Sequence, residues 1–172
     1  MIVLDSSTII LLAKAEILDT LLNSYKGDVI IPEAVERESA AGRTFDALLI
    51  KKRLEEGRIK VKAVNDEKVD RIMGDFGLNT GEAEAIILAL ESKGSVLGTD
   101  DRNAINACKI LHIPFTTAIG VLIRSREKNL VTKKEAIERL SKLAAYGWYK
   151  KEIIEDAKRR LEYAENAERK DR

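Results

Sequence analysis

The chain has 172 residues, 45% of them hydrophobic and 34% charged, which is typical of one globular domain with a sizeable core. Thirty basic and 29 acidic residues leave a net charge of +1, so the overall charge does not indicate a nucleic-acid-binding protein and local clusters must decide. Every apolar run is too short to span a bilayer, no secretory signal opens the chain, and the single Cys108 cannot form an intrachain disulfide, so we expect a cytoplasmic protein.

The first predicted strand, 2–4, is apolar at every position and ends at Asp5. A strand without a polar face belongs inside a parallel sheet that helices cover on both sides. Ligands of such sheets bind beyond the carboxyl ends of the strands, where Asp5 lies. Two interpretations stay open at this point. Asp5 carries chemistry, or Asp5 or Ser6 caps the following helix by accepting hydrogen bonds from unpaired N–H groups.

The remaining elements alternate between strand and helix in chain order. Short apolar or alternating runs predict further strands at 29–31, 59–64, 95–99 and 112–115. Apolar residues at three- and four-residue spacing predict helices at 8–25 with a break near 14–16, 33–41, 45–57, 65–77, 80–91, 104–111, 119–128, 133–146 and 150–165. Pro32 is acceptable as the first residue of its helix because its missing N–H would be unpaired there.

This alternation predicts an α/β sandwich with a central parallel sheet. We expect residues 1–130 to form the core of the protein. We expect 131–165 to form a C-terminal helical extension packed on that core, and 166–172 to form a charged, flexible tail.

Carboxylates stand at the ends of three separate predicted elements. Asp5 follows the first strand, Asp100 and Asp101 follow a later one, and Glu82 and Glu84 open a helix. In a parallel sheet, strand ends and the helix starts that follow them share one edge, so these acids can meet there. Clustered carboxylates repel one another unless cations neutralise them. Oxygen donors without His or Cys suit Mg²⁺ or Mn²⁺ rather than zinc.

Several of these acids also have a structural alternative. Glu82 stands three residues after Asn79 and could complete a capping box, and Asp100 or Asp101 could cap the helix that follows. Glu82 and Glu84 are about 200° apart on a helical wheel, so both reach one pocket only if the first helical turn is distorted.

Four short segments, taken in order, resemble the PIN domain family. PIN domains are small metal-dependent nucleases with a three-layer α/β/α sandwich, and many are toxins of prokaryotic toxin–antitoxin pairs. The resemblance covers about residues 1–126. It reaches about residue 161 if Gly147-Trp148-Tyr149 matches the aromatic dipeptide of a prokaryotic branch predicted to bind nucleic acids. The four segments are Val3-Leu4-Asp5-Ser6-Ser7, Ile31-Pro32-Glu33-Ala34-Val35-Glu36-Arg37-Glu38, Gly81-Glu82-Ala83-Glu84-Ala85-Ile86 and Thr99-Asp100-Asp101-Arg102.

The resemblance implies a metal-dependent ribonuclease that cleaves single-stranded RNA, with Mg²⁺ or Mn²⁺ as the cofactor. The acidic quartet that it implies consists of Asp5, Glu38, Glu82 and Asp100, with Glu84 and Asp101 as further metal ligands. On position alone, a solvated helical charge is the favoured interpretation of Glu38, as it is for Glu33 and Glu36. Many relatives have Thr-x-Asp after this strand, and aligning Thr99 in that way moves the ligand from Asp100 to Asp101.

The nuclease interpretation also gives roles to hydroxyls and to a local excess of basic side chains, each of which could equally be a solvated helix charge. Ser6 or Thr8 would orient a water molecule or a phosphate oxygen. Basic side chains that contact phosphates would make RNA binding salt-dependent. The candidates are Arg102, Lys109, Arg124, Arg126 and Lys128.

Other functions and partners follow from the same features. The alternative to an enzyme is a non-catalytic PIN-like module that binds RNA or a protein. An antitoxin protein is an expected partner if the chain is a toxin. We also expect a homodimer, because the apolar residues of 119–123 and 140–144 exceed what the short strands can cover. The competing explanation is that the final helix, with Ile153, Ile154, Ala157 and Leu161, folds back over them.

Overall fold

The computed structural model describes residues 1–164 and divides into two compact units. The first contains residues 1–10 and 25–117, and the second contains residues 11–24 and the described residues from 118 onward. The expected division into 1–130 and 131–165 stays a prediction. Residue 165 and the expected tail, 166–172, lie outside the described residues.

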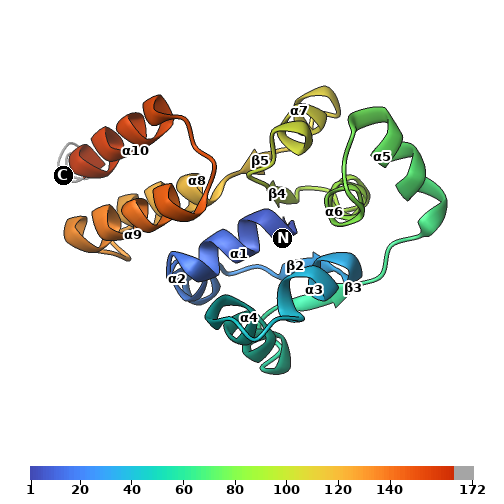
Figure 1. Cartoon of the computed structure of the whole chain (residues 1–172), viewed down its shortest axis with the longest axis horizontal. Helices are drawn as coiled ribbons and strands as arrows, with labels where there is room; N and C mark the ends of the chain where they lie inside the picture. Colours follow the sequence, from blue (N-terminus) through green and yellow to red (C-terminus); the bar gives the residue numbers. More distant parts are fainter. Residues whose placement is uncertain (165–172) are drawn as a thin grey trace. The chain divides into compact units, whose positions relative to one another are not determined.

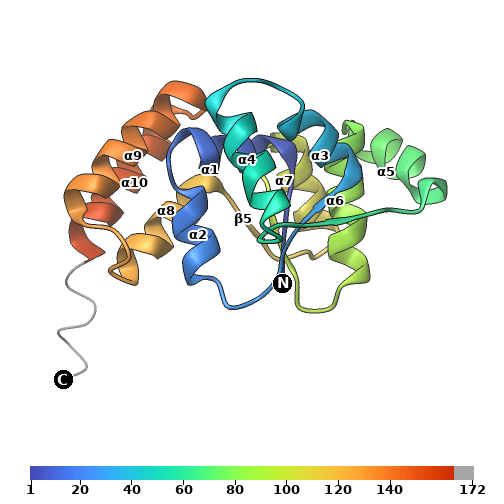
Figure 2. The same cartoon turned by 90° about the horizontal axis from the view of Figure 1, so that it is seen from below.

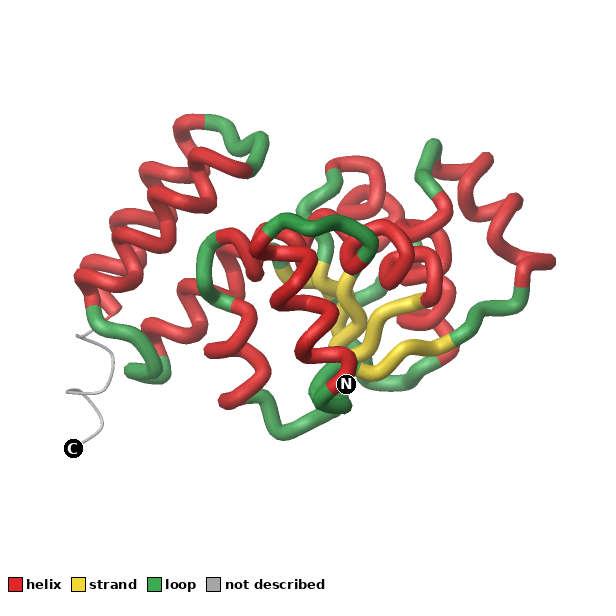
Figure 3. The backbone as a smooth tube through the Cα atoms, turned by 60° about the horizontal axis from the view of Figure 1, so that its bottom comes forward, coloured by secondary structure: helices red, strands yellow, loops and turns green. Residues whose placement is uncertain are grey.

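A five-stranded parallel sheet in the order β3-β2-β1-β4-β5 forms the centre of the first unit (Figure 3). β1 lies in the middle, with Ile2 paired to Val29 on one side and to Val96 on the other. This arrangement confirms the predicted α/β fold with a central parallel sheet. The strands are β1 (Ile2–Leu4), β2 (Val29–Pro32), β3 (Lys60–Lys62), β4 (Val96–Gly98) and β5 (Phe115–Thr116).

Helices cover both faces of this sheet, which gives the three-layer α/β/α sandwich of the predicted fold class. Figure 1 shows α6 and α7 on one side of the sheet and α1 and α4 on the other. The helices that lie wholly or partly in the first unit are α1 (Ser6–Lys14), α3 (Glu33–Ala40), α4 (Phe45–Glu55), α5 (Val69–Phe76), α6 (Thr80–Glu91) and α7 (Arg102–Ile110), with a 3₁₀ turn, η1 (Asp66–Lys68).

α6 is the central helix of this core. Its residues 83–89 are all buried, and the apolar ones pack on Val3, Ile30 and Leu97 of three neighbouring strands. Burial of an Ile or Leu side chain contributes about 1.5–3 kcal/mol each, so this contact holds the start of α6 firmly against the sheet. The acidic residues at that start are therefore carried by a rigid element.

Two local predictions differ from the structure. Pro32 is the last residue of β2, paired with Lys62, and α3 begins one residue later. Its backbone is extended at φ −73° and ψ 164°, a conformation that the proline ring allows as readily as the first helical position. The strand expected at 112–115 begins only at Phe115, and His112 adopts a left-handed φ of 55° that excludes it from an extended strand.

The second unit is helical over its described residues. It contains α2 (Leu18–Ser24), α8 (Ala118–Glu127), α9 (Lys133–Tyr146) and α10 (Lys151–Tyr163), together with the last turn of α1. α8, α9 and α10 pack against one another, as Figures 1 and 2 show. Over residues 1–164, no helix is long and apolar enough to cross a membrane.

The apolar residues that suggested a homodimer are covered within the chain. Residues 119, 121, 122 and 123 are buried, and so are Leu140 and Leu143. α10 packs on α8 and α9 with Ala157 and Leu161 almost completely buried. The final helix therefore covers this apolar surface within the chain. The homodimer stays a prediction, but exposed apolar residues at 119–123 and 140–144 no longer support it.

Candidate active site

The order of the strands places the candidate site at the carboxyl end of β1. The chain leaves β1 toward β2 and β3 on one side, and later returns to β4 on the other. Ligands of α/β proteins bind where the direction of such a sheet reverses, beyond the carboxyl ends of the strands. Asp5 directly follows β1, and its N–H donates to the carbonyl oxygen of Gly98 at 3.0 Å. Asp5 is thereby held beside the end of β4, which Thr99 and Asp100 follow.

The two carboxylate oxygens of Asp5 have different surroundings. Oδ1 accepts hydrogen bonds from the Thr8 N–H and the Ser7 hydroxyl, both at 2.8 Å, and so caps α1. Oδ2 is buried and accepts no hydrogen bond of ordinary geometry among the described residues, although the Thr99 hydroxyl is near enough to influence the carboxyl. An unsatisfied buried acceptor costs about 1–3 kcal/mol. Asp5 can therefore cap α1 and bind a ligand at the same time, because the cap uses Oδ1 and leaves Oδ2.

Burial is also the main influence on the protonation of Asp5. It raises the pKa of this carboxyl to about 6, and the charge of Asp100 adds to the rise. The nearby Thr99 hydroxyl, the Thr8 N–H and the Ser7 hydroxyl act in the opposite direction. The carboxyl of Asp5 therefore favours a proton or a cation more than an exposed aspartate does.

Hydroxyl groups of the first turn of α1 hold the neighbouring acids in place. Thr8 Oγ1 donates to Asp100 Oδ2 at 2.8 Å, and the Asp100 N–H donates to Ser7 Oγ at 3.4 Å. Ser6 Oγ donates to Glu38 Oε2. Ser7 is a residue that our sequence interpretation missed. Its place in a run of three hydroxyls directly after Asp5 was the available signal.

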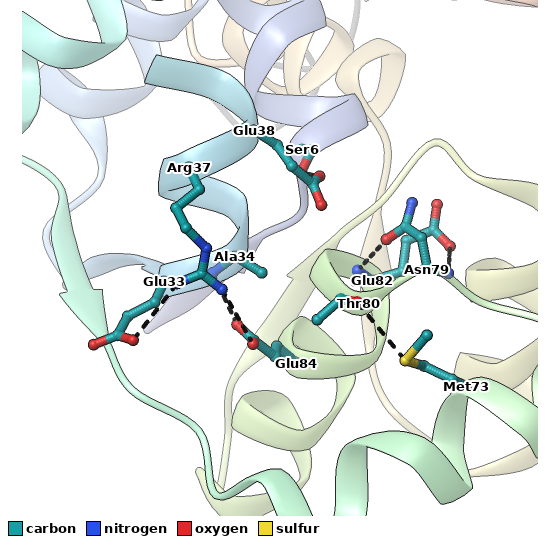
Figure 4. Close-up of polar contacts among 10 residues, drawn as sticks. All are labelled: Ser6, Glu33, Ala34, Arg37, Glu38, Met73, Asn79, Thr80, Glu82 and Glu84. Atoms are coloured by element: carbon teal, nitrogen blue, oxygen red, sulfur yellow. Dashed lines mark hydrogen bonds and ion pairs between the residues drawn. The ribbon is translucent and has the colours of Figure 1, made fainter. Parts of the chain in front are cut away.

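Glu38 reaches the same edge from the last part of α3. Figure 4 shows Glu38 and Ser6 side by side, and the Glu38 carboxylate also lies close to Gly81 at the start of α6. A Cβ atom at position 81 would lie 3.0 and 3.1 Å from the two carboxylate oxygens. A side chain at position 81 would therefore push the Glu38 carboxylate away by a few tenths of an ångström. Glu38 is exposed, as a solvated helical charge would be, but it also connects α3 to the starts of α1 and α6 through Ser6 and Gly81.

Glu82 forms the capping box that the sequence offered as its structural alternative. Its N–H donates to Asn79 Oδ1 at 2.8 Å, and its Oε2 accepts from the Asn79 N–H at 3.0 Å. Burial nevertheless raises the pKa of Glu82 to about 7, with further contributions from Asp101, Asp5 and Glu38, while the Asn79 N–H opposes the rise. Glu82 is therefore a capping residue that also interacts with the acidic cluster.

The two other acids that we predicted as ligands bond to backbone N–H groups. Glu84 is only 6% exposed, and its Oε2 accepts from the Ala34 N–H at 3.0 Å. Asp101 Oδ1 accepts from the N–H groups of Asn103 and Ala104, at 2.7 and 2.9 Å, and caps α7. Each has a structural role, and their binding of metal stays a prediction.

A family model described as a PIN domain matches residues 1–163. The chain belongs to the PIN domain family. This match confirms the resemblance carried by the four short segments, and it extends through α10. No curated protein and no solved structure matches the chain.

The residues of this PIN domain suit a hard divalent cation in their chemistry. All candidate donors are carboxylate oxygens, and Asp5 Oδ2 is buried and accepts no hydrogen bond of ordinary geometry among the described residues. Over residues 1–164, however, no three Asp, Glu, His or Cys side chains gather in metal-binding geometry. Glu38 and Glu82 bond instead to Ser6 and to the Asn79 N–H. Binding an ion would require the candidate acids to come closer to one another than they lie in this structure.

The candidate phosphate contacts of this PIN domain differ in their exposure. Arg102 and Lys109 are exposed on α7, in the first unit. In the second unit, Lys128 is exposed and Arg124 pairs with Glu127 at 3.1 Å. Arg126 is only 3% exposed, and its Nη1 donates to Asn129 at 3.0 Å. A contact between Arg126 and a phosphate would require its side chain to leave this position.

Proposed function

We propose that this PIN domain is a nuclease dependent on Mg²⁺ or Mn²⁺ that hydrolyses phosphodiester bonds within single-stranded RNA. The proposal rests on acids from four separate segments, which hydrogen bonds and charge connect to the region at the carboxyl end of β1, and on the buried Asp5 Oδ2. The acids are Asp5, Glu38, Glu82 and Asp100.

A bound divalent cation would supply an activated water molecule and stabilise the negative charge on the phosphoryl oxygens. Asp5 Oδ2 and the carboxylates of Asp100, Glu38 and Glu82 would hold it. The hydroxyls of Ser6 and Thr8, which now donate to Glu38 and Asp100, would keep those carboxylates oriented or turn toward a water or a phosphate oxygen. Because Asp5 and Glu82 retain protons to about pH 6 and 7, metal affinity should rise as these protons are lost.

The exposed start of α7 supports an RNA substrate. Arg102 follows Asp100 and Asp101 directly, so its guanidinium belongs to the same end of the sheet as the acids. Arg102, together with Lys109 farther along α7, could neutralise phosphates of a bound strand. A single-stranded substrate, a role as a toxin and an antitoxin partner follow from the family resemblance and stay predictions. The homodimer and the cytoplasmic location were inferred from the sequence itself, and they also stay predictions.

A cleavage assay on a panel of single-stranded RNAs tests the proposal. We expect products with Mg²⁺ or Mn²⁺, none with excess EDTA, and none from Asp5→Asn, which also controls for a contaminating nuclease. The control variant Glu135→Gln removes a capping carboxylate of α9 and should cleave normally. Equal cleavage in excess EDTA would contradict the metal-dependent mechanism.

One observation favours the alternative of a non-catalytic module. Glu82, Glu84 and Asp101 each bond to backbone N–H groups, as acids with purely structural roles do. Such a module would bind RNA or a protein partner without cleaving RNA. Measuring binding and cleavage on the same RNA panel separates the two functions.

A further inference from the structure

Helix α3 begins without a cap of its own. Its N-cap residue, Pro32, has no side-chain hydrogen bond to the helix. The first N–H groups of a helix have no acceptor within it, so they need one from elsewhere. Glu84 of α6 provides that acceptor, because its buried Oε2 accepts from the N–H of Ala34, the second residue of α3, at 3.0 Å. A residue 50 positions away in the chain thus caps α3.

The same two helices touch again about one turn farther along α3. Glu38 follows Ala34 by four residues and Gly81 precedes Glu84 by three, spacings that keep each pair on one face of its helix. The Glu38 carboxylate lies close to the Gly81 backbone, and Figure 4 shows the Glu84 contact with α3. Contacts at two points define how far along α6 the helix α3 lies and how it is rotated. The position of the Glu38 carboxylate therefore depends on both contacts.

Arg37 adds a weaker tie between the same helices. Its guanidinium lies 3.8 Å from the Glu33 carboxylate and 4.0 Å from that of Glu84. The Arg37 side chain is 65% exposed, so water screens both ion pairs. The buried hydrogen bond from the Ala34 N–H to Glu84 is consequently the main connection, and an uncharged acceptor at position 84 could maintain it.

We propose that Glu84 is a positioning residue that caps α3 and thereby places Glu38 in the acidic site, and that Glu84 itself does not bind the metal. The effect on Glu38 rests on the proposed function, whereas the cap does not. The Gly81-Glu82-Ala83-Glu84 segment then has three different roles. Gly81 makes room for Glu38, Glu82 belongs to the acidic cluster, and Glu84 supports the helix that carries Glu38.

The cap is tested without metal or RNA, by amide hydrogen exchange of Ala34 in the full chain. Glu84→Gln retains an acceptor oxygen, so we expect Ala34 to exchange at nearly its original rate. Glu84→Leu removes the acceptor, and we expect exchange at least about tenfold faster. The control Glu135→Gln alters a capping residue of α9, far from Ala34 in the chain, and should leave the exchange of Ala34 unchanged. Unchanged exchange in Glu84→Leu would overturn the cap.

Titration with Mn²⁺ alone distinguishes positioning from ligation. We expect Glu84→Gln to bind Mn²⁺ within about threefold of the original chain, and Glu84→Leu to bind about tenfold more weakly. In a Glu38→Gln background, the effect of Glu84→Leu should disappear, because the two residues act through the same contact. A Glu84→Gln variant that loses as much affinity as Asp5→Asn would overturn the proposal in favour of a ligand role.

Two further outcomes are separable. If Glu84→Leu does not fold, Glu84→Gln still decides, since ligation requires the charge and capping requires only the oxygen. If the original chain binds no Mn²⁺, the proposed function and the effect on Glu38 both fail, while the exchange of Ala34 still confirms or refutes the cap.

Discussion

The starts of α6 and α9 contain the same local motif in different surroundings. Each helix opens with a capping box, formed by Asn79 and Glu82 in α6 and by Thr132 and Glu135 in α9. Hydrogen bonds from the backbone N–H and hydroxyl of Thr132 lower the pKa of the exposed Glu135. Burial raises the pKa of Glu82 to about 7, and three other carboxylates add to the rise.

This difference shows that a capping box does not determine whether its glutamate also belongs to an acidic cluster. The hydrogen bonds that form it depend on residues three positions apart, and they are present in both helices. Whether the glutamate is also part of an acidic cluster depends on segments far away in the chain. The pair therefore offers matched variants, one inside the candidate site and one outside it.

The largest expected effect comes from Asp5→Asn compared with Glu135→Gln. Asn can cap α1 as well as Asp does, so the fold should persist, but one acidic ligand is lost. We expect RNA cleavage to fall at least about 100-fold, more than the loss of a residue that only supports a metal ligand usually causes. Glu135→Gln should cleave at the original rate. Initial cleavage rates and circular dichroism of the three proteins provide the measurement, and an active Asp5→Asn would refute the site.

The next effect compares the two capping glutamates directly. Gln can complete a capping box as Glu does, so Glu82→Gln and Glu135→Gln both keep their helix starts. We expect Glu82→Gln to weaken Mn²⁺ binding by about 10- to 100-fold, and Glu135→Gln to leave it unchanged. Calorimetric titration measures both. Equal affinities in the two variants would mean that Glu82 is a structural cap and nothing more.

The acids of the candidate site and Glu135 at the start of α9 should change the free energy of unfolding in opposite directions as pH changes, when EDTA is present. The pKa of Asp5 rises from 3.8 to about 6 on folding and that of Glu82 from 4.5 to about 7, so the folded chain retains protons that the unfolded chain has lost. The free energy of unfolding should therefore fall as pH rises from about 4 to 7. The lowered pKa of Glu135 acts in the other sense, with stability lost as pH falls through that value.

Asp5→Asn removes the larger part of that pH dependence. We expect the variant to be about 1–3 kcal/mol more stable than the original chain at pH 8, and the difference to shrink near pH 4. Urea denaturation in EDTA at the two pH values measures it. A difference independent of pH would show that the Asp5 carboxyl is not held in an unfavourable charged state.

The smallest effect extends the comparison to two arginines, an exposed one in the first unit and a buried one in the second. Arg102 is exposed at the start of α7, whereas Arg126 is buried in α8. In the Asp5→Asn background, Arg102→Ala should lower the slope of log affinity against log salt by about one, without changing the melting temperature. Arg126→Ala should lower the melting temperature and leave that slope unchanged. Fluorescence anisotropy with a labelled single-stranded RNA measures the salt slope, and thermal denaturation measures the melting temperature. The reverse pattern in the two variants would contradict this prediction.

Much of the fold could be predicted because its determinants are local. The bounds of α9, 133–146, agree between the sequence pattern and the structure, since helical period and a capping box both act within a few residues. The break between α1 and α2 was predicted for the same reason. Parallel strands also follow from runs such as 2–4, whose apolar side chains on both faces require helices above and below.

The sequence alone determined which acids stand at the ends of elements, but only the tertiary structure decided what each one contacts. Thr8 and Asp100 are 92 residues apart, and Glu84 and Ala34 are 50 apart. No local pattern encodes such pairs. Burial likewise raises the pKa of Glu82 but not that of Glu135, and it leaves Arg126 almost without contact with water. Neither effect can be predicted locally, because loss of water depends on every segment that packs around a group. Local hydrogen bonds can be predicted from residues a few positions apart, whereas a group loses its water only when distant segments pack around it.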